Sequence, residues 1–189
     1  MKIFIRFIIS ILILSLSNVS FSLAETPEEK GLRLAIEADL TGEGFVDTIS
    51  QSQMTLRNAQ GEESIREFSS KTLEVDNDGD KSIFIFHHPK DVKGTATLTF
   101  THKTGPDDQW LYLPALKRVK RISSDNRSGA FVGSEFAYED LASQEVEKYT
   151  YKWIDDVPCP GDEAEMCYIS ESYPVEKSSG YTRRVSWVD

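Results

Sequence analysis

The 189 residues include 21 basic and 31 acidic side chains, which gives a formal net charge of −10. So acidic a chain repels the phosphate backbone, and the composition therefore argues against nucleic acid as a partner. The length fits one domain and leaves no room for a second.

The N-terminus is typical of a cleavable export signal. Two basic residues precede an apolar run over residues 7–16, and small residues follow at positions 22 and 24. A membrane span would need roughly 20 apolar residues, so an uncleaved anchor is the weaker alternative. We expect cleavage after Ala24, which makes residues 1–24 a signal peptide and residues 25–189 one exported domain. The mature chain keeps 19 basic against 31 acidic residues, a net charge of about −12.

A short helix is predicted at the start of the mature chain. Thr26 is a suitable N-cap, Pro27 fits the first helical position, and Glu29 completes a capping box. The helix should end near the glycines at positions 42 and 44. Its expected apolar edge consists of Leu32, Ala35 and Ile36.

Short segments rich in β-branched and aromatic residues follow, separated by turn-forming residues. This pattern predicts a meander of antiparallel hairpins, so the fold class is α+β and mainly β. The expected strands cover residues 46–58, 64–75, 82–88, 95–103, 109–113, 118–122, 145–154, 168–173 and 181–188.

Two of these segments indicate how the sheet is covered. Residues 95–102 alternate between threonine and mostly apolar side chains, which predicts one buried and one wet face. Residues 83–86 read Ile-Phe-Ile-Phe and are apolar on both sides. We expect a central strand there, with both faces covered by a helix, a lid or a ligand.

The apolar segment at residues 131–141 is a lid candidate. It predicts a short helix with Phe136 and Leu141 pointing inward. An ordinary turn that caps the core is an equally good interpretation. Tyr149, Tyr151 and Trp153 share one face of a later predicted strand. These aromatic side chains either fill the core or line a pocket for an acyl chain.

Cys159 and Cys167 are the only cysteines, and they lie close together in an exported chain. We therefore predict that they form a disulfide. A metal site or a redox pair is less well supported, because the spacing is not Cys-x-x-Cys and no histidine is adjacent.

No catalytic signature is present, so we predict a protein that is not an enzyme and binds no cofactor or metal. His87 and His88 would point to opposite faces of a strand, and with His102 they fit structural roles better than catalysis. The acidic residues 76–80 resemble a calcium loop. The loop would require glycine and glutamate where this chain has Lys81 and His87, which favours a solvated turn.

One dense basic run interrupts this acidic sequence. Lys117, Arg118, Lys120 and Arg121 follow an aromatic segment, and alternation distributes them over both faces of a strand. They either pair with nearby acids and solvent or form a docking site for anionic lipid or an acidic partner.

Three blocks of the sequence occur together in this order: Lys93-Gly-Thr-Ala-Thr-Leu98, Asp108-Gln-Trp-Leu-Tyr-Leu-Pro-Ala-Leu-Lys-Arg-Val-Lys-Arg-Ile122 and Gly133-Ser-Glu-Phe-Ala-Tyr-Glu-Asp-Leu141. With these blocks the chain resembles the outer membrane lipoprotein-sorting family, the LolA-like carriers of the bacterial periplasm. The resemblance covers nearly the whole mature chain. It implies a curved antiparallel sheet, an incomplete barrel, with a helical lid over an apolar cavity. Relatives usually continue through further strands beyond the segment that matches residues 183–189, so we expect a domain truncated at its C-terminus.

The resemblance implies a non-catalytic carrier for lipid or lipoprotein acyl chains, with an inner membrane export complex and an outer membrane acceptor as partners. A module that docks on an export complex without carrying cargo is the alternative, and a hydrolase is a remote third. The candidate cavity and lid residues are Phe84, Phe86, Leu98, Phe100, Trp110, Tyr112, Phe136, Leu141, Tyr149, Tyr151 and Trp153. The docking candidates are Lys117, Arg118, Lys120 and Arg121. The oligomeric state does not follow from the sequence.

Overall fold

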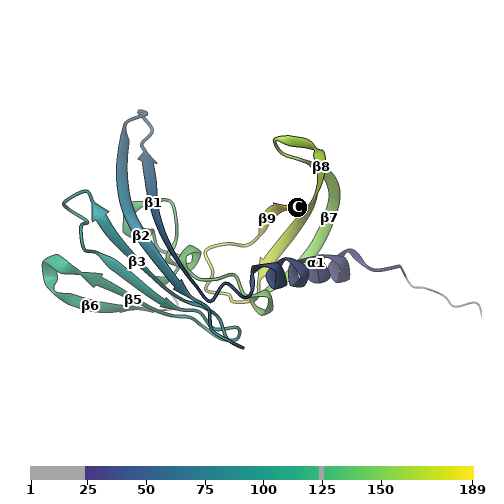
Figure 1. The fold of residues 1–189 in the computed structure, drawn as a ribbon, viewed down its shortest axis with the longest axis horizontal. Coiled ribbons are helices and arrows are strands. Elements are labelled where there is room, and N and C mark those ends of the chain that lie inside the picture. The colour runs from purple at the N-terminus through teal and green to yellow at the C-terminus, as the bar shows by residue number, and fades with distance from the viewer. Residues whose placement is uncertain (1–23, 124–125) are drawn as a thin grey trace, which may run out of the picture.

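The computed structural model describes residues 24–123 and 126–189, which form one α-helix and two antiparallel sheets (Figure 1). All but the last residue of the predicted signal peptide lies outside the described residues. Within these described residues the two sheets do not join into a closed barrel. The predicted fold class, a mainly β domain with an N-terminal helix and an unclosed antiparallel sheet, is confirmed.

Helix α1 (Pro27–Gly42) begins with the predicted capping box. The Glu29 backbone N–H donates to Thr26 Oγ1 at 3.2 Å, and the Thr26 N–H donates to Glu29 Oε2 at 2.8 Å. These bonds satisfy two amide groups that have no partner within the helix.

The buried side of α1 differs from the predicted apolar edge. Leu32 and Ile36 are each 43% exposed, and Ala35 is half-buried. The helix instead packs through Gly31, the one buried residue of α1. Glycine is required there because a Cβ atom would lie 2.6 Å from the backbone nitrogen of Trp153. The helix backbone therefore lies directly on strand β7 (Tyr149–Cys159), which belongs to the smaller, three-stranded sheet.

The six-stranded sheet follows chain order, and each strand pairs with its neighbour in sequence. Its strands are β1 (Asp47–Arg57), β2 (Glu63–Leu73), β3 (Lys81–His88), β4 (Ala96–Phe100), β5 (Asp108–Leu113) and β6 (Arg118–Ile122). The three-stranded sheet contains β7 (Tyr149–Cys159), β8 (Asp162–Pro174) and β9 (Arg184–Val188).

All nine predicted strands are confirmed, with shifted ends. Strand β7 begins at Tyr149 because residues 146–148 form a 3-10 turn. Strands β7 and β8 extend beyond the prediction to a tight turn at Pro160 and Gly161, where Gly161 has a φ of +92°. Positive φ favours glycine, so this residue allows the hairpin to close.

Strand register divides the six-stranded sheet into two faces. Phe84 lies opposite Thr97, and Ile83 lies opposite Leu98, so the two pairs occupy opposite sides. We call the first side the inner face; it includes Phe68, Ser82, Phe84, Phe86, Thr97, Thr99 and Gln109. We call the second side the outer face; it includes Ile83, Ile85, Leu98, Phe100, Trp110 and Tyr112.

Residues 126–148, which we call the lid segment, cover the inner face. Their regular structure consists of short 3-10 turns at Phe131–Gly133, Tyr138–Leu141 and Val146–Lys148. Under this cover Thr97 and Thr99 are completely buried, whereas the alternating residues Leu98 and Phe100 remain half-buried. The threonine side of β4 is thus the buried one, the reverse of what hydropathy favours.

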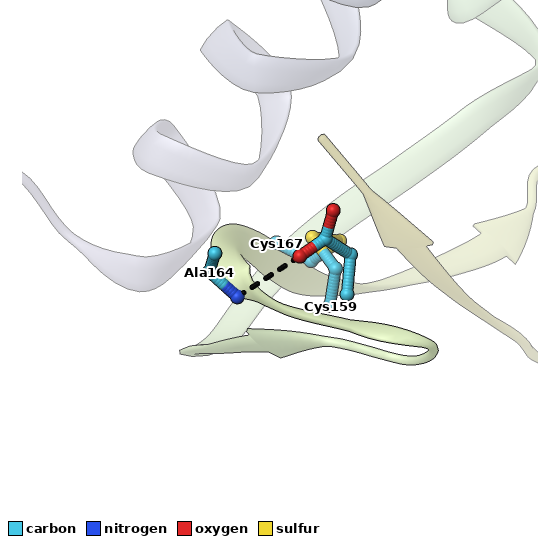
Figure 2. The surroundings of a disulfide bond; sticks show 4 residues. Cys159, Ala164 and Cys167 are labelled. Atoms are coloured by element: carbon cyan, nitrogen blue, oxygen red, sulfur yellow. Dashed lines mark hydrogen bonds between the residues drawn. A yellow bond between two sulfur atoms is a disulfide. The ribbon is translucent and has the colours of Figure 1, made fainter.

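The predicted disulfide between Cys159 and Cys167 is present and closes the end of the β7–β8 hairpin (Figure 2). The two Cα atoms are 4.9 Å apart. Beside it, the Ala164 backbone N–H donates to Asp162 Oδ1 at 3.0 Å, which orders the turn that the disulfide closes.

The contact between α1 and β7 generates a stability prediction. Gly31→Ala should lower the free energy of unfolding by about 1–3 kcal/mol, because the added methyl group meets strand backbone that has little room to move. Urea denaturation of the mature protein measures this. Gly42→Ala is the matched control, since nothing lies within 4 Å of its added Cβ. An equal loss in both variants would contradict the packing argument.

The turn before β3 generates a prediction about pH. His102 Nδ1 lies 2.9 Å from Asp78 Oδ2, and this hydrogen bond, with a second one to Asp108, raises the pKa of His102 above its usual 6.5. The His102 ring and the Lys103 N–H lower the pKa of Asp78 to about 2.

The raised pKa of His102 contributes to the free energy of unfolding below pH 6.5, and this contribution is lost as the pH rises through the folded pKa. The contribution that comes from the lowered pKa of Asp78 is lost only as the pH falls toward 2. His102→Gln should therefore destabilise the protein more at about pH 5 than at about pH 9, as measured by urea denaturation. Equal destabilisation at both values would show that the ion pair contributes nothing.

Candidate functional site

The most distinctive apolar site is an aromatic cluster between the sheet and the lid segment. Phe131 of the lid segment is 1% exposed and contacts Phe86 and Phe84, with ring centroids 5.5 and 6.5 Å apart. Phe68 joins from the sheet, and Tyr138 joins from the lid segment. The cluster is therefore divided between a regular sheet and an irregular cover.

Polar side chains of the sheet hold the lid segment in place. Gln109 Nε2 donates to the carbonyl oxygen of Tyr138 at 2.8 Å, and the Ser143 N–H donates to Thr101 Oγ1 at 3.2 Å. Arg66 donates to the carbonyl oxygen of Val132. An irregular segment has backbone N–H and C=O groups that find no partner within the segment, and these side chains hydrogen-bond to such groups.

The closed arrangement does not satisfy every buried polar atom. Thr97 Oγ1 and Arg66 Nε have no hydrogen-bond partner among the described residues. Unsatisfied buried polar atoms are uncommon and costly. The interface between lid segment and sheet is therefore less favourable than a fully satisfied core.

The structure places the predicted lid residues differently from the expectation. The inward orientation of Phe136 is wrong, because this side chain is 54% exposed, while Leu141 is half-buried. Phe131 takes the inward position, and sequence reasoning missed it. The prediction assumed a short helix, whereas Val132 and Gly133 have positive φ values of 48° and 73° and redirect the chain after Phe131.

The other predicted cavity residues do not gather at this cluster. Phe84 and Phe86 lie in it, but Leu98, Phe100, Trp110 and Tyr112 lie on the outer face of the same sheet. There Phe100 and Trp110 pack edge to face, with centroids 5.2 Å apart.

The predicted aromatic wall lies on the small sheet, beside α1. Tyr149 and Tyr151 line a groove of about 600 Å³ together with Leu32 and Tyr173. Burial raises the pKa of both Tyr149 and Tyr151, so these phenols remain neutral. Trp153 is half-buried and does not line this groove, and Lys30 Nζ lies 3.7 Å from its ring centroid. The groove is a second apolar surface, separate from the aromatic cluster.

The basic run forms the end of the six-stranded sheet. Lys117 is the residue before β6; Arg118 and Lys120 lie on the inner side of the strand and Arg121 on the outer side. The predicted distribution over two faces is confirmed. Arg121 pairs with Asp108, whereas the other three cations are exposed.

A polar cavity of about 840 Å³ lies where the end of α1, the loop between β2 and β3, and the lid segment meet. It is lined by acids that include Asp39, Glu74, Asp80 and Glu145. Burial raises the pKa of Asp80 and Glu145. Within the described residues, no group of three or more His, Cys, Asp or Glu side chains is arranged to hold a metal ion.

The predicted turn at residues 76–80 is confirmed. The Asp78 carboxylate in this turn is hydrogen-bonded to the ring of His102. The described part of the chain contains no helix that is both long and apolar enough to span a membrane.

Comparisons with known proteins found one family model and several similar solved structures. A family model described as an uncharacterized protein matches residues 78–189, more than half of the chain. A domain from Vibrio parahaemolyticus, assigned to outer membrane lipoprotein sorting, is 52% identical, with a TM-score of 0.81 over 86% of this chain and 67% of that chain. No curated protein sequence matches.

Two further solved structures are similar. A DUF1329 family protein from Desulfovibrio piger is 30% identical, with a TM-score of 0.78 over 86% of this chain and 68% of that chain. A LolA superfamily protein from Nitrosomonas europaea is 20% identical, with a TM-score of 0.48 over 76% and 56%. The identity and coverage of the Vibrio parahaemolyticus domain show that the chain belongs to the outer membrane lipoprotein-sorting protein family, the family that its sequence resembles.

Proposed function

We propose that the protein is a periplasmic carrier that shields the acyl chains of a lipid or lipoprotein on its way to the outer membrane. The observation that carries this proposal is the division of the aromatic cluster. Phe68, Phe84 and Phe86 belong to the sheet, while Phe131 belongs to a cover without long helices or strands. Displacement of the cover would expose an apolar surface without breaking the sheet.

Rough magnitudes favour exchange of Phe131 for an acyl chain. Exposing one buried phenylalanine costs about 2–3 kcal/mol, whereas each buried methylene contributes about 0.8 kcal/mol. A chain of several methylenes can therefore offset the loss of Phe131 from the cluster. The polar contacts of Gln109 and Arg66 add a further cost, which keeps the site closed when no cargo is bound.

The relative assigned to lipoprotein sorting supports the same cargo class. A carrier of this kind needs a donor at the inner membrane and an acceptor at the outer membrane. The exposed cations Lys117, Arg118 and Lys120 at the β6 edge are the docking candidates for one of them. The predicted export signal is part of this proposal, because cargo that travels from the inner to the outer membrane must be carried outside the inner membrane.

One prediction from this proposal concerns cargo uptake. Phe84→Ser should reduce the uptake of a fluorescent fatty acid at least tenfold, because the inner face loses a central apolar contact. Ile83→Ser is the matched control: Ile83 is also half-buried on β3 but faces the opposite side. Both variants must first show the far-ultraviolet circular dichroism of the native protein.

Native mass spectrometry of the mature protein, followed by organic extraction, provides the complementary measurement. Co-purified phospholipid or acylated protein that is lost in Phe84→Ser supports the carrier. A native protein that contains no lipid and takes up no fatty acid would contradict it. The alternative, a non-carrying module that docks on an export complex, would then be favoured.

Another prediction from this proposal concerns lid opening. Gln109→Leu removes the hydrogen bond to the Tyr138 carbonyl from a side chain that is 3% exposed. We expect faster fatty acid uptake, because the closed state loses a contact while the aromatic cluster is unchanged. Stopped-flow fluorescence measures the rate. An unchanged or slower rate, in a variant that remains folded, would show that lid release does not limit uptake.

A further inference from the structure

The polar cavity between the end of α1, the loop between β2 and β3, and the lid segment carries a strong negative charge. Seven of the described residues that line it are acidic, whereas Lys103 is the only basic one among them. The whole chain has 31 acidic and 21 basic residues, so acids are concentrated here well beyond the average composition. A cavity lined by one sign of charge attracts ions of the opposite sign, so this one favours cations.

Three of these acids are held by hydrogen bonds within the protein. Glu74 accepts two backbone N–H groups from the segment between α1 and β1. Asp78 hydrogen-bonds to the His102 ring and accepts one backbone N–H, and Asp80 accepts the hydroxyl of Ser143 at 3.4 Å. These three carboxylates order the polypeptide around the cavity and contribute charge to it, but they do not require a ligand.

Glu145 differs from these acids because it is buried without a partner. The residue is 7% exposed and lines the cavity, yet its carboxylate forms no hydrogen bond or ion pair with any described residue. It extends from the lid segment to the loop between β2 and β3, where a Cβ atom on Gly79 would lie 2.8 Å from its Oε1. A buried carboxylate without a partner is strongly unfavourable. Its position therefore points to a cationic partner from outside the described residues.

The lysines near Glu145 do not supply this partner. Lys148 pairs with Asp107 instead. Lys103 lines the cavity but is too far from Glu145 to form an ion pair with it. Burial and the nearby charge of Asp39 raise the pKa of Glu145, which agrees with a carboxylate that lacks a direct cationic partner.

A second carboxylate of the cavity is also without a partner. Asp39 on α1 is half-buried and forms no hydrogen bond or ion pair within the described part of the chain. Asp39 and Glu145 belong to different elements, and no group of three or more described His, Cys, Asp or Glu side chains is arranged to hold a metal ion. A metal ion needs several oxygens that converge on one point, whereas an ammonium group presents three N–H donors and can pair with a single carboxylate.

The size of the cavity is suited to a small molecule. Its volume of about 840 Å³ lies within the roughly 300–1,000 Å³ that is typical of small-molecule pockets. The ligand must be slender enough to reach Glu145 inside the cavity, and it needs a second positive group for Asp39. An aliphatic chain with an ammonium group near each end meets both requirements.

We propose that this cavity binds an aliphatic diamine or polyamine, with one ammonium group at Glu145 and another at Asp39. The site is separate from the proposed cargo site, because its lining includes none of the rings of the aromatic cluster. A bound amine would link α1 to the lid segment through one molecule.

Isothermal titration calorimetry of the mature protein with spermidine tests the proposal. The native protein should bind spermidine with one-to-one stoichiometry, and binding should weaken as salt is added. Glu145→Gln should weaken binding about tenfold or more, because a charge-assisted hydrogen bond in a buried place is lost. Asp39→Asn should weaken it by a smaller factor, because Asp39 is only half-buried.

A matched control separates the cavity from general attraction to an acidic protein. Glu135→Gln removes the same charge from an exposed position of the lid segment that does not line the cavity. This variant should bind spermidine like the native protein. All three variants should retain fatty acid uptake, so failure of this proposal is distinguishable from failure of the carrier proposal.

Urea denaturation without spermidine separates a binding role of Glu145 from a structural one. Glu145→Gln replaces an unpartnered buried carboxylate by a neutral amide of the same shape. The variant should therefore be at least as stable as the native protein. A structural glutamate would show the reverse, a loss of stability with binding unchanged.

Four results would overturn the inference. The first is the absence of spermidine binding at low salt, and the second is equal weakening in Glu145→Gln and Glu135→Gln. The third is a Glu145→Gln variant that is less stable than the native protein and still binds spermidine normally. The fourth is calcium binding that depends on Glu145 and prevents spermidine from binding, which would make the cavity a metal site.

Discussion

The closed state depends on hydrogen bonds between an irregular chain segment and the polar side chains of a sheet. The lid segment has many backbone groups without helical or strand partners, so the sheet beneath it must present donors and acceptors as well as apolar groups. Gln109 and Thr101 fulfil this need, and the phenylalanines next to them supply the apolar contact. The inner face is thus a mixture of threonine and phenylalanine, a composition that neither a solvent-exposed face nor an ordinary core requires.

The same requirement explains why sequence reasoning succeeded for the strands and failed for the lid. Period-2 alternation and turn residues located all nine strands, because these signals are local. The side of β4 that is buried depends on what lies above it, and the threonines gave no local sign of their cover. Phe131 was missed for the same reason: its inward position is set by the positive φ of Val132 and Gly133, not by a helical period.

The candidate site was predictable in part. Phe84 and Phe86 were identified because β3 is apolar on both sides, and the structure brings them together with Phe131. Leu98 and Trp110 were grouped with them on hydropathy alone, yet the register places them on the opposite face. Hydropathy finds apolar surfaces but does not assign them to a common site. That assignment requires the pairing partners of each strand.

The two faces of the six-stranded sheet differ in how their apolar groups are covered, and this difference follows from β3. A strand that is apolar on both sides would ordinarily be buried on both sides. Here the inner side packs against the lid segment across an interface in which two polar atoms of the sheet, Thr97 Oγ1 and Arg66 Nε, have no hydrogen-bond partner among the described residues. On the outer side Ile83 and Ile85 remain half-buried. The proposed carrier function requires only the inner side to open, because an acyl chain that replaces Phe131 there would restore the apolar contact of Phe84 and Phe86 without any change in the pairing of β3.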